Sequence, residues 1–260
     1  MTKRPYILIT NDDGVHAPGI KHLWHALKEF ADMAIIAPTS EQSATSLSIT
    51  LRSPLHIEKT EWQNGVSVWN VNGTPTDCVK LGLNVILNKK PDLIVSGINR
   101  GNNGGRNVLY SGTVAAAIEG VLQGIPSVAL SCHDYWDPEY HVTESHISKI
   151  VHHVLDHPLP TGTLLNVNFP PKESDGIKGY KLTRQGREFW MENPSERSHP
   201  TEKNTYYWLG ARIAQFEEEE DCDVTWLRKG YVAAVPIHID QLTDHHHLQV
   251  RKDSFEKLFR

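Results

Sequence analysis

The sequence contains few cysteines and no long apolar run. The three cysteines, Cys78, Cys132 and Cys222, lie far apart and form no C-x-x-C pair, a pattern that favours a reducing compartment over a disulfide-bonded scaffold. The longest apolar run near the N-terminus covers only residues 6–9, which is too short for a signal peptide or a membrane span. We therefore expect a cytoplasmic protein with no membrane partner.

The chain also lacks an excess of positive charge. Its 26 Lys and Arg residues are outnumbered by 31 Asp and Glu residues, which gives a net charge of -5 at pH 7. Proteins that coat nucleic acid usually carry a basic surface, so we expect no nucleic-acid polymer among the partners. The 260 residues, 39% of them hydrophobic, suffice for one large α/β domain with an extension.

Several catalytic motifs are missing as well. The sequence has no H-E-x-x-H, G-x-S-x-G, Walker A or G-x-G-x-x-G pattern, which disfavours zinc proteases, α/β-hydrolases, P-loop NTPases and dinucleotide-binding enzymes. Three of the 15 histidines form a tract at 245–247. We interpret this tract as part of a polar C-terminal segment rather than as a metal site.

The most informative stretch is an apolar run that ends in two acids. Residues 6–9 (YILI) show no polar alternation, which predicts a strand buried on both faces of a parallel sheet. Asp12 and Asp13 follow at its carboxyl end, where ligands bind in open α/β sheets. Gly14 would let the chain leave strand geometry, so that both carboxylates reach one ion. The alternative is an ordinary turn in which Asn11 and Asp12 cap their own backbone.

Polar residues follow two further predicted strands. The strand at 33–37 leads into a loop rich in Ser and Thr that contains Ser43, and the strand at 91–96 is followed by Asn99. Parallel strands end at one edge of a sheet, so these residues join Asp12 and Asp13 in an all-oxygen set that suits Mg²⁺ or Mn²⁺ and not zinc. For the Ser/Thr-rich loop alone, a solvated turn is the simpler interpretation.

Two predicted helix starts carry polar residues. Ser111, Gly112 and Thr113 open a helix at 114–123, and the free N–H groups and positive dipole end at such a start form an anion site. The alternative is that Ser111 only caps the helix. Asp77 lies at the third helical position after a Thr-Pro pair, and we assign it to a capping box rather than to catalysis.

The order of the predicted elements indicates an α/β fold with a Rossmann-like, doubly wound and mostly parallel sheet. Strand and helix alternate up to about residue 170, and a β-hairpin around Asn64 and Gly65 is added. Beyond residue 170 the alternation stops, and we treat 171–260 as the C-terminal extension of a single domain. The elements expected there are a strand or hairpin at 206–216, an acidic loop or helix start at 217–221, a helix at 223–229, a strand at 231–237 and a tail helix at 254–259.

Five sequence blocks occur in a definite order along the chain. They are N-D-D-G at 11–14, A-P-T-S-E-Q-S-A at 37–44, G-T-P-T-D-C-V at 73–79, S-G-I-N at 96–99 and Y-S-G-T-V-A-A-A at 110–117. Together they resemble the SurE family of survival-protein nucleotidases. The resemblance is dense over roughly the first 130 residues and extends more thinly to G-Y-V-A-A-V-P at 230–236.

This resemblance implies a phosphatase that hydrolyses nucleoside monophosphates, as a 5′- and 3′-nucleotidase, with one divalent cation (Mg²⁺ or Mn²⁺) in each active site. It also implies a homodimer or homotetramer that uses the C-terminal extension. The family's metal ligands correspond to Asp12, Asp13, Ser43 and Asn99, and the two aspartates are also its catalytic residues. Its phosphate-contacting positions correspond to Asn103, Ser111, Gly112 and Thr113. Members usually carry an acid where this chain has Asn107, a departure that bears on rate or substrate preference.

Two other functions remain open at this stage. Phosphatases of the haloacid-dehalogenase type also place acids after a first strand, but they need an Asp-x-Asp nucleophile pair. Asp12 and Asp13 are contiguous, which disfavours a covalent aspartyl-phosphate. A metal-dependent nucleotide sensor without turnover would use the same ligands. Release of phosphate from nucleotides separates a sensor from an enzyme.

Overall fold

The computed structural model describes residues 4–62, 64–172, 176–210 and 212–259. Nine strands of this part of the chain form one central sheet: β1 (Tyr6–Thr10), β2 (Asp32–Pro38), β3 (Ile57–Glu61), β4 (Ser67–Val71), β5 (Leu93–Arg100), β6 (Ser127–Cys132), β7 (Thr163–Asn168), β8 (Tyr180–Leu182) and β13 (Val232–His238). Their order is β3-β4-β2-β1-β5-β6-β7-β13-β8. The strands from β4 to β7 run parallel. The predicted Rossmann-like α/β fold is confirmed.

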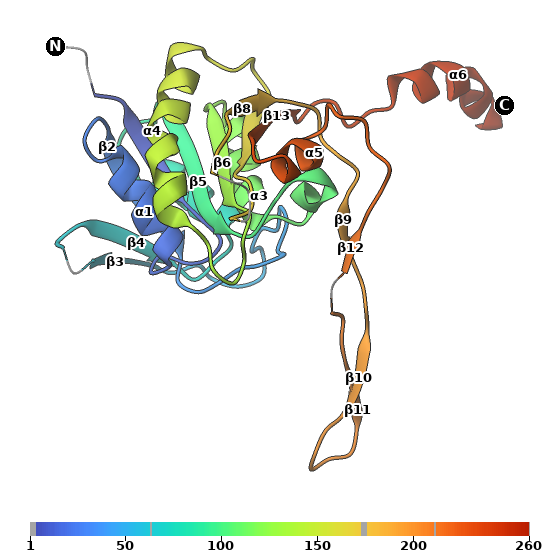
Figure 1. Ribbon diagram of the computed structural model, residues 1–260, viewed down its shortest axis with the longest axis horizontal. Coiled ribbons are helices and arrows are strands. Elements are labelled where there is room, and N and C mark those ends of the chain that lie inside the picture. Colours follow the sequence, from blue (N-terminus) through green and yellow to red (C-terminus); the bar gives the residue numbers. More distant parts are fainter. Residues whose placement is uncertain (1–3, 63, 173–175, 211, 260) are drawn as a thin grey trace.

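Helices cover both faces of this sheet (Figure 1). Helices α1 (Pro18–Leu27) and α4 (Tyr140–Asp156) pack against each other on one face. Helix α2 (Pro75–Leu81), its π-helical continuation η1 (Gly82–Ile86) and helix α3 (Gly112–Leu122) lie on the other. The result is the three-layer arrangement of a doubly wound fold.

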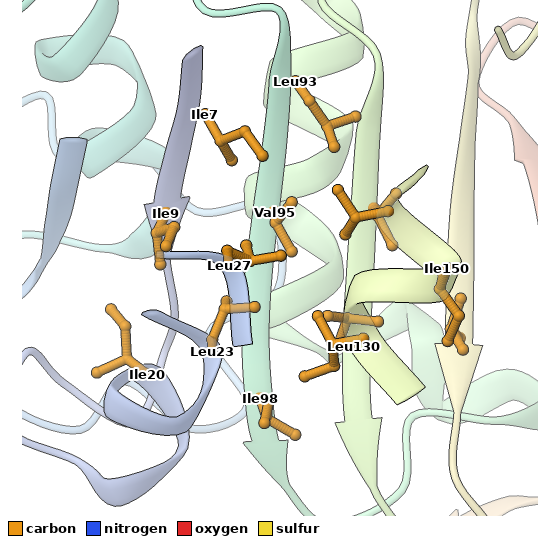
Figure 2. Close-up of a cluster of buried hydrophobic side chains, with 14 of the residues drawn as sticks. Ile7, Ile9, Ile20, Leu23, Leu27, Leu93, Val95, Ile98, Leu130 and Ile150 are labelled. Carbon is orange, nitrogen blue, oxygen red and sulfur yellow. The ribbon is translucent and has the colours of Figure 1, made fainter. Parts of the chain in front are cut away.

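The alternation of side chains along β1 explains how both layers are held. Ile7 and Ile9 belong to the buried cluster that includes the apolar face of α1, whereas Leu8, between them, belongs to the cluster under α2. Successive strand residues point to opposite faces, so an unbroken apolar run supports a layer on each side. Figure 2 shows the first cluster, in which Leu23 and Leu27 of α1 lie close to the side chains of β1 and β5.

The hairpin of β3 and β4 is confirmed, and it joins the sheet through the parallel pairing of β4 with β2. From β1 the chain first builds outward through β2 and β4, and it then returns to place β5 on the other side of β1. The direction of winding therefore reverses between β1 and β5. In open α/β sheets, the crevice at the carboxyl ends of two such strands is the usual ligand site.

The part of the chain after residue 170 contributes to the sheet and also leaves it. Strand β13 pairs antiparallel with β7, and β8 pairs with β13. Two ribbons, β9 (Phe189–Met191) with β12 (Arg212–Ala214) and β10 (Ser195–Ser198) with β11 (Thr205–Trp208), form a long arm that extends from the body (Figure 1). The expected helix near 223–229 is α5 (Asp223–Arg228).

Two predictions for this part need correction. The stretch 206–216 is neither one strand nor one hairpin, because its strands β11 and β12 pair with β10 and β9, which the polar sequence before it did not reveal. The tail helix begins earlier than residue 254: α6 (His245–Glu256) starts where Asp244 accepts a hydrogen bond from the N–H of His247 at 2.9 Å. It ends in a 3₁₀ turn, η3 (Lys257–Phe259), and the histidine tract is its first turn. The acidic run 217–221 is a loop, as expected.

Among the described residues, no helix is both long and apolar enough to cross a membrane.

Candidate functional site

Asp12 and Asp13 follow β1 at the crevice, and each carboxylate bonds to a different element. Asp12 is 5% exposed, and its Oδ1 accepts a hydrogen bond from the hydroxyl of Thr113 in the first turn of α3. The Oδ2 of Asp13 accepts the N–H of Arg100, at the end of β5, at 3.1 Å. The two acids therefore connect β1 with the helix start on one side and with the neighbouring strand on the other.

The turn that follows is closed by Asn11 and not by the acids. Asn11 Nδ2 donates to the carbonyl of Gly14 at 2.9 Å. Gly14 has φ of +100°, a conformation that favours glycine. The turn interpretation is thus correct for Asn11. The carboxylates of Asp12 and Asp13 accept hydrogen bonds from Thr113 and Arg100, which lie far away in the sequence.

The two carboxylates lie where negative charge is costly. Burial raises the pKa of Asp12, although the Thr113 hydroxyl opposes the shift. Burial and the charge of Asp12 raise the pKa of Asp13 to about 7. A bound divalent cation would offset both effects, since opposite charge favours the ionised form. The donor set and its electrostatics therefore fit a hard cation such as Mg²⁺ or Mn²⁺.

Ser43 lies in the loop that passes beside Asp12. The N–H of Gln42 donates to the backbone carbonyl of Asp12 at 2.7 Å, which fixes the loop next to the acids. The hydroxyl of Ser43 is exposed and donates to Glu41 Oε1 at 2.5 Å. The structure thus brings the predicted Ser43 segment to the edge where Asp12 lies.

Asn99 reaches the same edge through an irregularity in β5. The register between β5 and β6 shifts between Ser96 and Asn99, at Gly97, where a Cβ atom would lie 2.3 Å from the carbonyl oxygen of Leu130. Only glycine fits there. Asn99 Nδ2 donates to the carbonyl of Gly101 at 2.7 Å, which leaves the amide oxygen as the atom that can bind a cation.

The start of α3 touches Asp12 directly. Ser111 is the N-cap, and its Oγ accepts the N–H of Val114 at 3.1 Å, so the capping interpretation is correct. A Cβ atom on Gly112 would lie 2.8 Å from Asp12 Cβ and 3.0 Å from Asp12 Oδ2. Because the hydroxyl of Thr113 also donates to Asp12, the predicted anion site at the start of α3 lies directly against Asp12.

Asn103 is buried and held in place by the ends of two strands. Its N–H donates to Asn168 Oδ1 at 2.8 Å, and its carbonyl accepts from Asn166 Nδ2 at 2.9 Å. Its own Nδ2 donates to Ser131 Oγ at 2.8 Å. The side chain of Asn103 is therefore anchored at the carboxyl end of β6, and its backbone is anchored at the carboxyl end of β7.

Sequence reasoning missed an ion pair at the rim of the site. Arg100 lies 3.2 Å from Glu41 Oε2, and its guanidinium group stacks at 4.4 Å over the ring of Tyr135. Glu41 also accepts from Ser43, and its charge raises the pKa of both Asp12 and Asp13. Glu41 lies within the sequence block at 37–44, and Arg100 directly follows the block at 96–99. Their positions in and beside these blocks were the available sequence signal for the ion pair.

Asp77 forms the predicted capping box. Its Oδ2 accepts the N–H of Thr74 at 2.9 Å, and its N–H donates to the hydroxyl of Thr74 at 3.1 Å. Oδ2 also accepts the hydroxyl of Thr50 at 2.7 Å. Asp77 therefore fixes the end of the Ser43 loop to α2.

Two more buried polar residues tie the loop around Asn103 to the C-terminal part of the chain. Asn107, in the 3₁₀ helix η2 (Gly105–Leu109), accepts the N–H of Trp190 on β9 at 2.8 Å. Asp223 accepts the N–H of Gly105 at 2.8 Å and that of Gly186 at 2.7 Å. Asp223 carried no sequence signal, because its partners lie 118 and 37 positions away.

Comparisons with known proteins agree on one family. A family model described as "Survival protein SurE" matches residues 7–192. A 5′-nucleotidase SurE of Protochlamydia amoebophila is 58% identical over 257 residues, which covers 98% of both chains. One of Flavobacterium psychrophilum is 42% identical, over 95% of this chain and 96% of that one. The crystal structure of a SurE protein from Aquifex aeolicus superposes with a TM-score of 0.81 at 36% identity, over 96% of this chain and 100% of that one.

Proposed function

The chain belongs to the SurE family of survival proteins, and from this membership we propose that it is a 5′-nucleotidase, a divalent-metal-dependent phosphatase of nucleoside monophosphates. The observation that supports this function best is the contact of Asp12 with the first turn of α3. It joins a pair of carboxylates, of which that of Asp12 is buried and that of Asp13 is half-buried, to a helix start at a topological switch point. Such a junction can hold a cation and a phosphate side by side.

In this proposal, the cation is held by Asp12, Asp13, Ser43 and Asn99. The two carboxylates supply negative charge, and the hydroxyl and the amide oxygen complete an oxygen set. Asn103, Ser111, Gly112 and Thr113 bind the phosphate. The positive end of the α3 dipole would favour the negative charge of the phosphate, and the hydroxyl of Thr113 keeps Asp12 oriented.

A bound Mg²⁺ or Mn²⁺ would neutralise charge on the phosphoryl oxygens and lower the pKa of water. The task of the protein is to position the phosphate against the carboxylates, which is most of what phosphoryl transfer requires. Gly112 contributes by its small size, because it lets the helix start approach Asp12 closely. We propose that Asp12 and Asp13 also orient the attacking water.

Phosphate release from a nucleotide panel tests the function. Purified protein is incubated with 5′- and 3′-nucleoside monophosphates, with Mg²⁺, with Mn²⁺ and with a chelator. We expect release of phosphate from 5′-nucleotides with either ion and no release with the chelator. The 3′-nucleotides show whether the protein is also a 3′-nucleotidase. Binding of nucleotide without release would support the sensor instead, although the family membership does not favour it.

We also propose that the C-terminal extension, residues 171–260, makes the protein a homodimer or homotetramer. Helix α6 has no buried residue, and it exposes Leu248, Val250 and Phe255 away from the body (Figure 1). The arm exposes Trp190 and Trp208. Apolar surface of this kind gains stability when a second copy covers it. Sedimentation equilibrium tests this, and a monomer at micromolar concentration would contradict it.

Finally, we propose that the protein works in the cytoplasm. Its three cysteines, all in the described part of the chain, are buried and unpaired. Such thiols suit a reducing compartment. Fractionation of the producing cells tests the location.

A further inference from the structure

A second group of possible metal ligands lies between α1 and α4, on surface that the proposed active site does not use. His22 and His25 lie three positions apart on α1, and His141 and Glu144 lie three positions apart on α4. Residues at this spacing share one face of a helix. Because α1 and α4 pack against each other (Figure 1), the two faces meet.

The ligand atoms in this group are already close. One ligand atom each of His22, His141 and Glu144 lies within 4.8 Å of the other two. The Nδ1 of His22 is 2.5 Å from Glu144 Oε2. The rings of His22 and His141 are in edge contact, with centroids 4.5 Å apart. Ligands of a tetrahedral Zn²⁺ lie about 3.3 Å from one another, since each is about 2.0 Å from the ion. To hold an ion, the contact between His22 and Glu144 would lengthen, and separations longer than this, up to 4.8 Å, would shorten.

The remaining contact of Glu144 resembles the support that metal ligands receive from neighbouring side chains. His25 bonds through Nδ1 to Glu144 Oε1, so both oxygens of the carboxylate face imidazoles. A partner of this kind orients a ligand without touching the ion. His25 thus serves as a positioning residue for Glu144.

The chemistry of this group differs from that of Asp12 and Asp13. Two imidazoles and one carboxylate suit Zn²⁺ and similar transition-metal ions, whereas the all-oxygen set suits Mg²⁺ or Mn²⁺. The group lines a cleft of about 670 Å³, whose wall also includes Trp62 and His16. His141 is exposed. An ion can therefore enter from solvent, and water can fill the fourth position.

We propose that His22, His141 and Glu144 form a second metal site, for Zn²⁺ or a similar transition-metal ion, that clamps α1 to α4. The alternative is that Glu144 only accepts hydrogen bonds from His22 and His25. A clamp would act near the active site, because α1 begins just after Asp13 and His22 stacks on Tyr140 with centroids 5.4 Å apart. An ion that binds only the folded state stabilises it, and the stabilisation increases with the ion concentration relative to the dissociation constant.

Calorimetric titration of the full-length protein with Zn²⁺ tests the site. Saturating Mg²⁺ is present throughout, so that the oxygen site is occupied. The variants are His141→Gln and Glu144→Gln, which remove proposed ligands, and His25→Gln, which removes the residue that positions Glu144. His153→Gln is the matched control, because His153 lies on α4 in a stacked pair with His157, outside the group. A variant with His245, His246 and His247 replaced by Gln removes the tract on α6.

We expect the wild type to bind one Zn²⁺ ion at this site. His141→Gln and Glu144→Gln should each raise the dissociation constant of this ion by about 100-fold. His25→Gln should raise it by about tenfold, which is typical of residues that support a metal ligand. The His153 and tract variants should keep this equivalent. Zn²⁺ should raise the melting temperature of wild type and not that of His141→Gln. Equal titrations for wild type, His141→Gln and Glu144→Gln, or loss of the equivalent only in a control variant, would overturn the proposal. His141 is exposed, so its variant should fold even if Glu144→Gln does not.

Discussion

The hydroxyl of Thr113 donates a hydrogen bond to the carboxylate of Asp12, a residue 101 positions earlier in the chain. Both side chains are buried. Asp12 follows the first strand, and Thr113 lies in the first turn of α3. This bond links the proposed metal ligands to the proposed phosphate site.

Replacing Thr113 by Val removes the hydroxyl and keeps the shape of the side chain. Asp12 then loses a hydrogen bond to a charged group, and we expect kcat to fall about tenfold, the kinetic equivalent of about 1.4 kcal/mol. Thr113→Ser keeps the donor and should keep most of the activity. Steady-state kinetics on a 5′-nucleotide measures both, and equal rates for Val and Ser would refute a role for the hydroxyl.

Gly112→Ala should lower both activity and stability. The added Cβ would lie 2.8 Å from Asp12 Cβ, and such overpacking typically costs about 1–3 kcal/mol. Gly120→Ala is the matched control on the same helix, because its Cβ would meet Ser127 Oγ at 2.2 Å and not Asp12. Urea denaturation should show both variants destabilised. At urea concentrations below the unfolding transitions of both variants, only Gly112→Ala should lose activity. A similar loss of activity in Gly120→Ala would show that general destabilisation causes the effect.

Asn107 stands where the resemblance to the family leads us to expect an acid, so it can be used to compare an amide with a carboxylate at this position. Its side-chain oxygen accepts the N–H of Trp190, and a carboxylate can accept the same bond. We therefore expect Asn107→Asp to fold and to bind metal as wild type does. Asn107→Leu leaves the N–H of Trp190 unpaired and should destabilise by about 1–3 kcal/mol. Thermal melts separate the two, and equal stability of Leu and wild type would contradict the account.

Asp223 should make stability depend on pH. Burial raises its pKa, although the N–H groups of Gly105, Gly186 and Val224 oppose the shift. A folded-state pKa above the unfolded value of about 3.9 means that the folded protein binds the proton more tightly. Protonation of Asp223 therefore stabilises the folded protein. This contribution to the free energy of unfolding is fully present below about pH 3.9, and it is lost as the pH rises through the folded-state pKa of Asp223.

The measurement for Asp223 is urea denaturation at several pH values between 4 and 7, for wild type and Asp223→Asn. The asparagine does not titrate and serves as the reference. The free energy of unfolding of wild type relative to the variant should decline as pH rises. A difference that grows in favour of wild type over this range would show that the pKa is lowered instead.

The sequence predicted the core of the fold because each parallel strand is an unbroken apolar run. β1, β5 and β6 could be located from such runs, and their carboxyl ends then placed Asp12, Asp13 and Asn99 at one edge. Asp77 was assigned correctly, since a capping box is a local pattern. These features depend on short-range chemistry that a single sequence contains.

What the sequence did not reveal depends on contacts between distant segments. The strands β9 to β12 of the arm are short and mostly exposed, so their sequence shows no alternation of buried apolar and exposed polar residues that would mark them as strands. Asp223 and the pairing of Arg100 with Glu41 require a folded chain to be recognised. Helix α6 has no buried face, and only its cap, Asp244, marks where it starts.

Asp12→Asn, assayed with and without metal, tests the central claim most directly. The phosphate released from a 5′-nucleotide is measured for wild type and variant across a Mn²⁺ titration, and circular dichroism checks the fold. The account predicts release by wild type that requires the ion, and a loss of about 100-fold or more in a folded Asp12→Asn protein. Release at the wild-type rate by that variant, or release that survives complete removal of the metal, would contradict it.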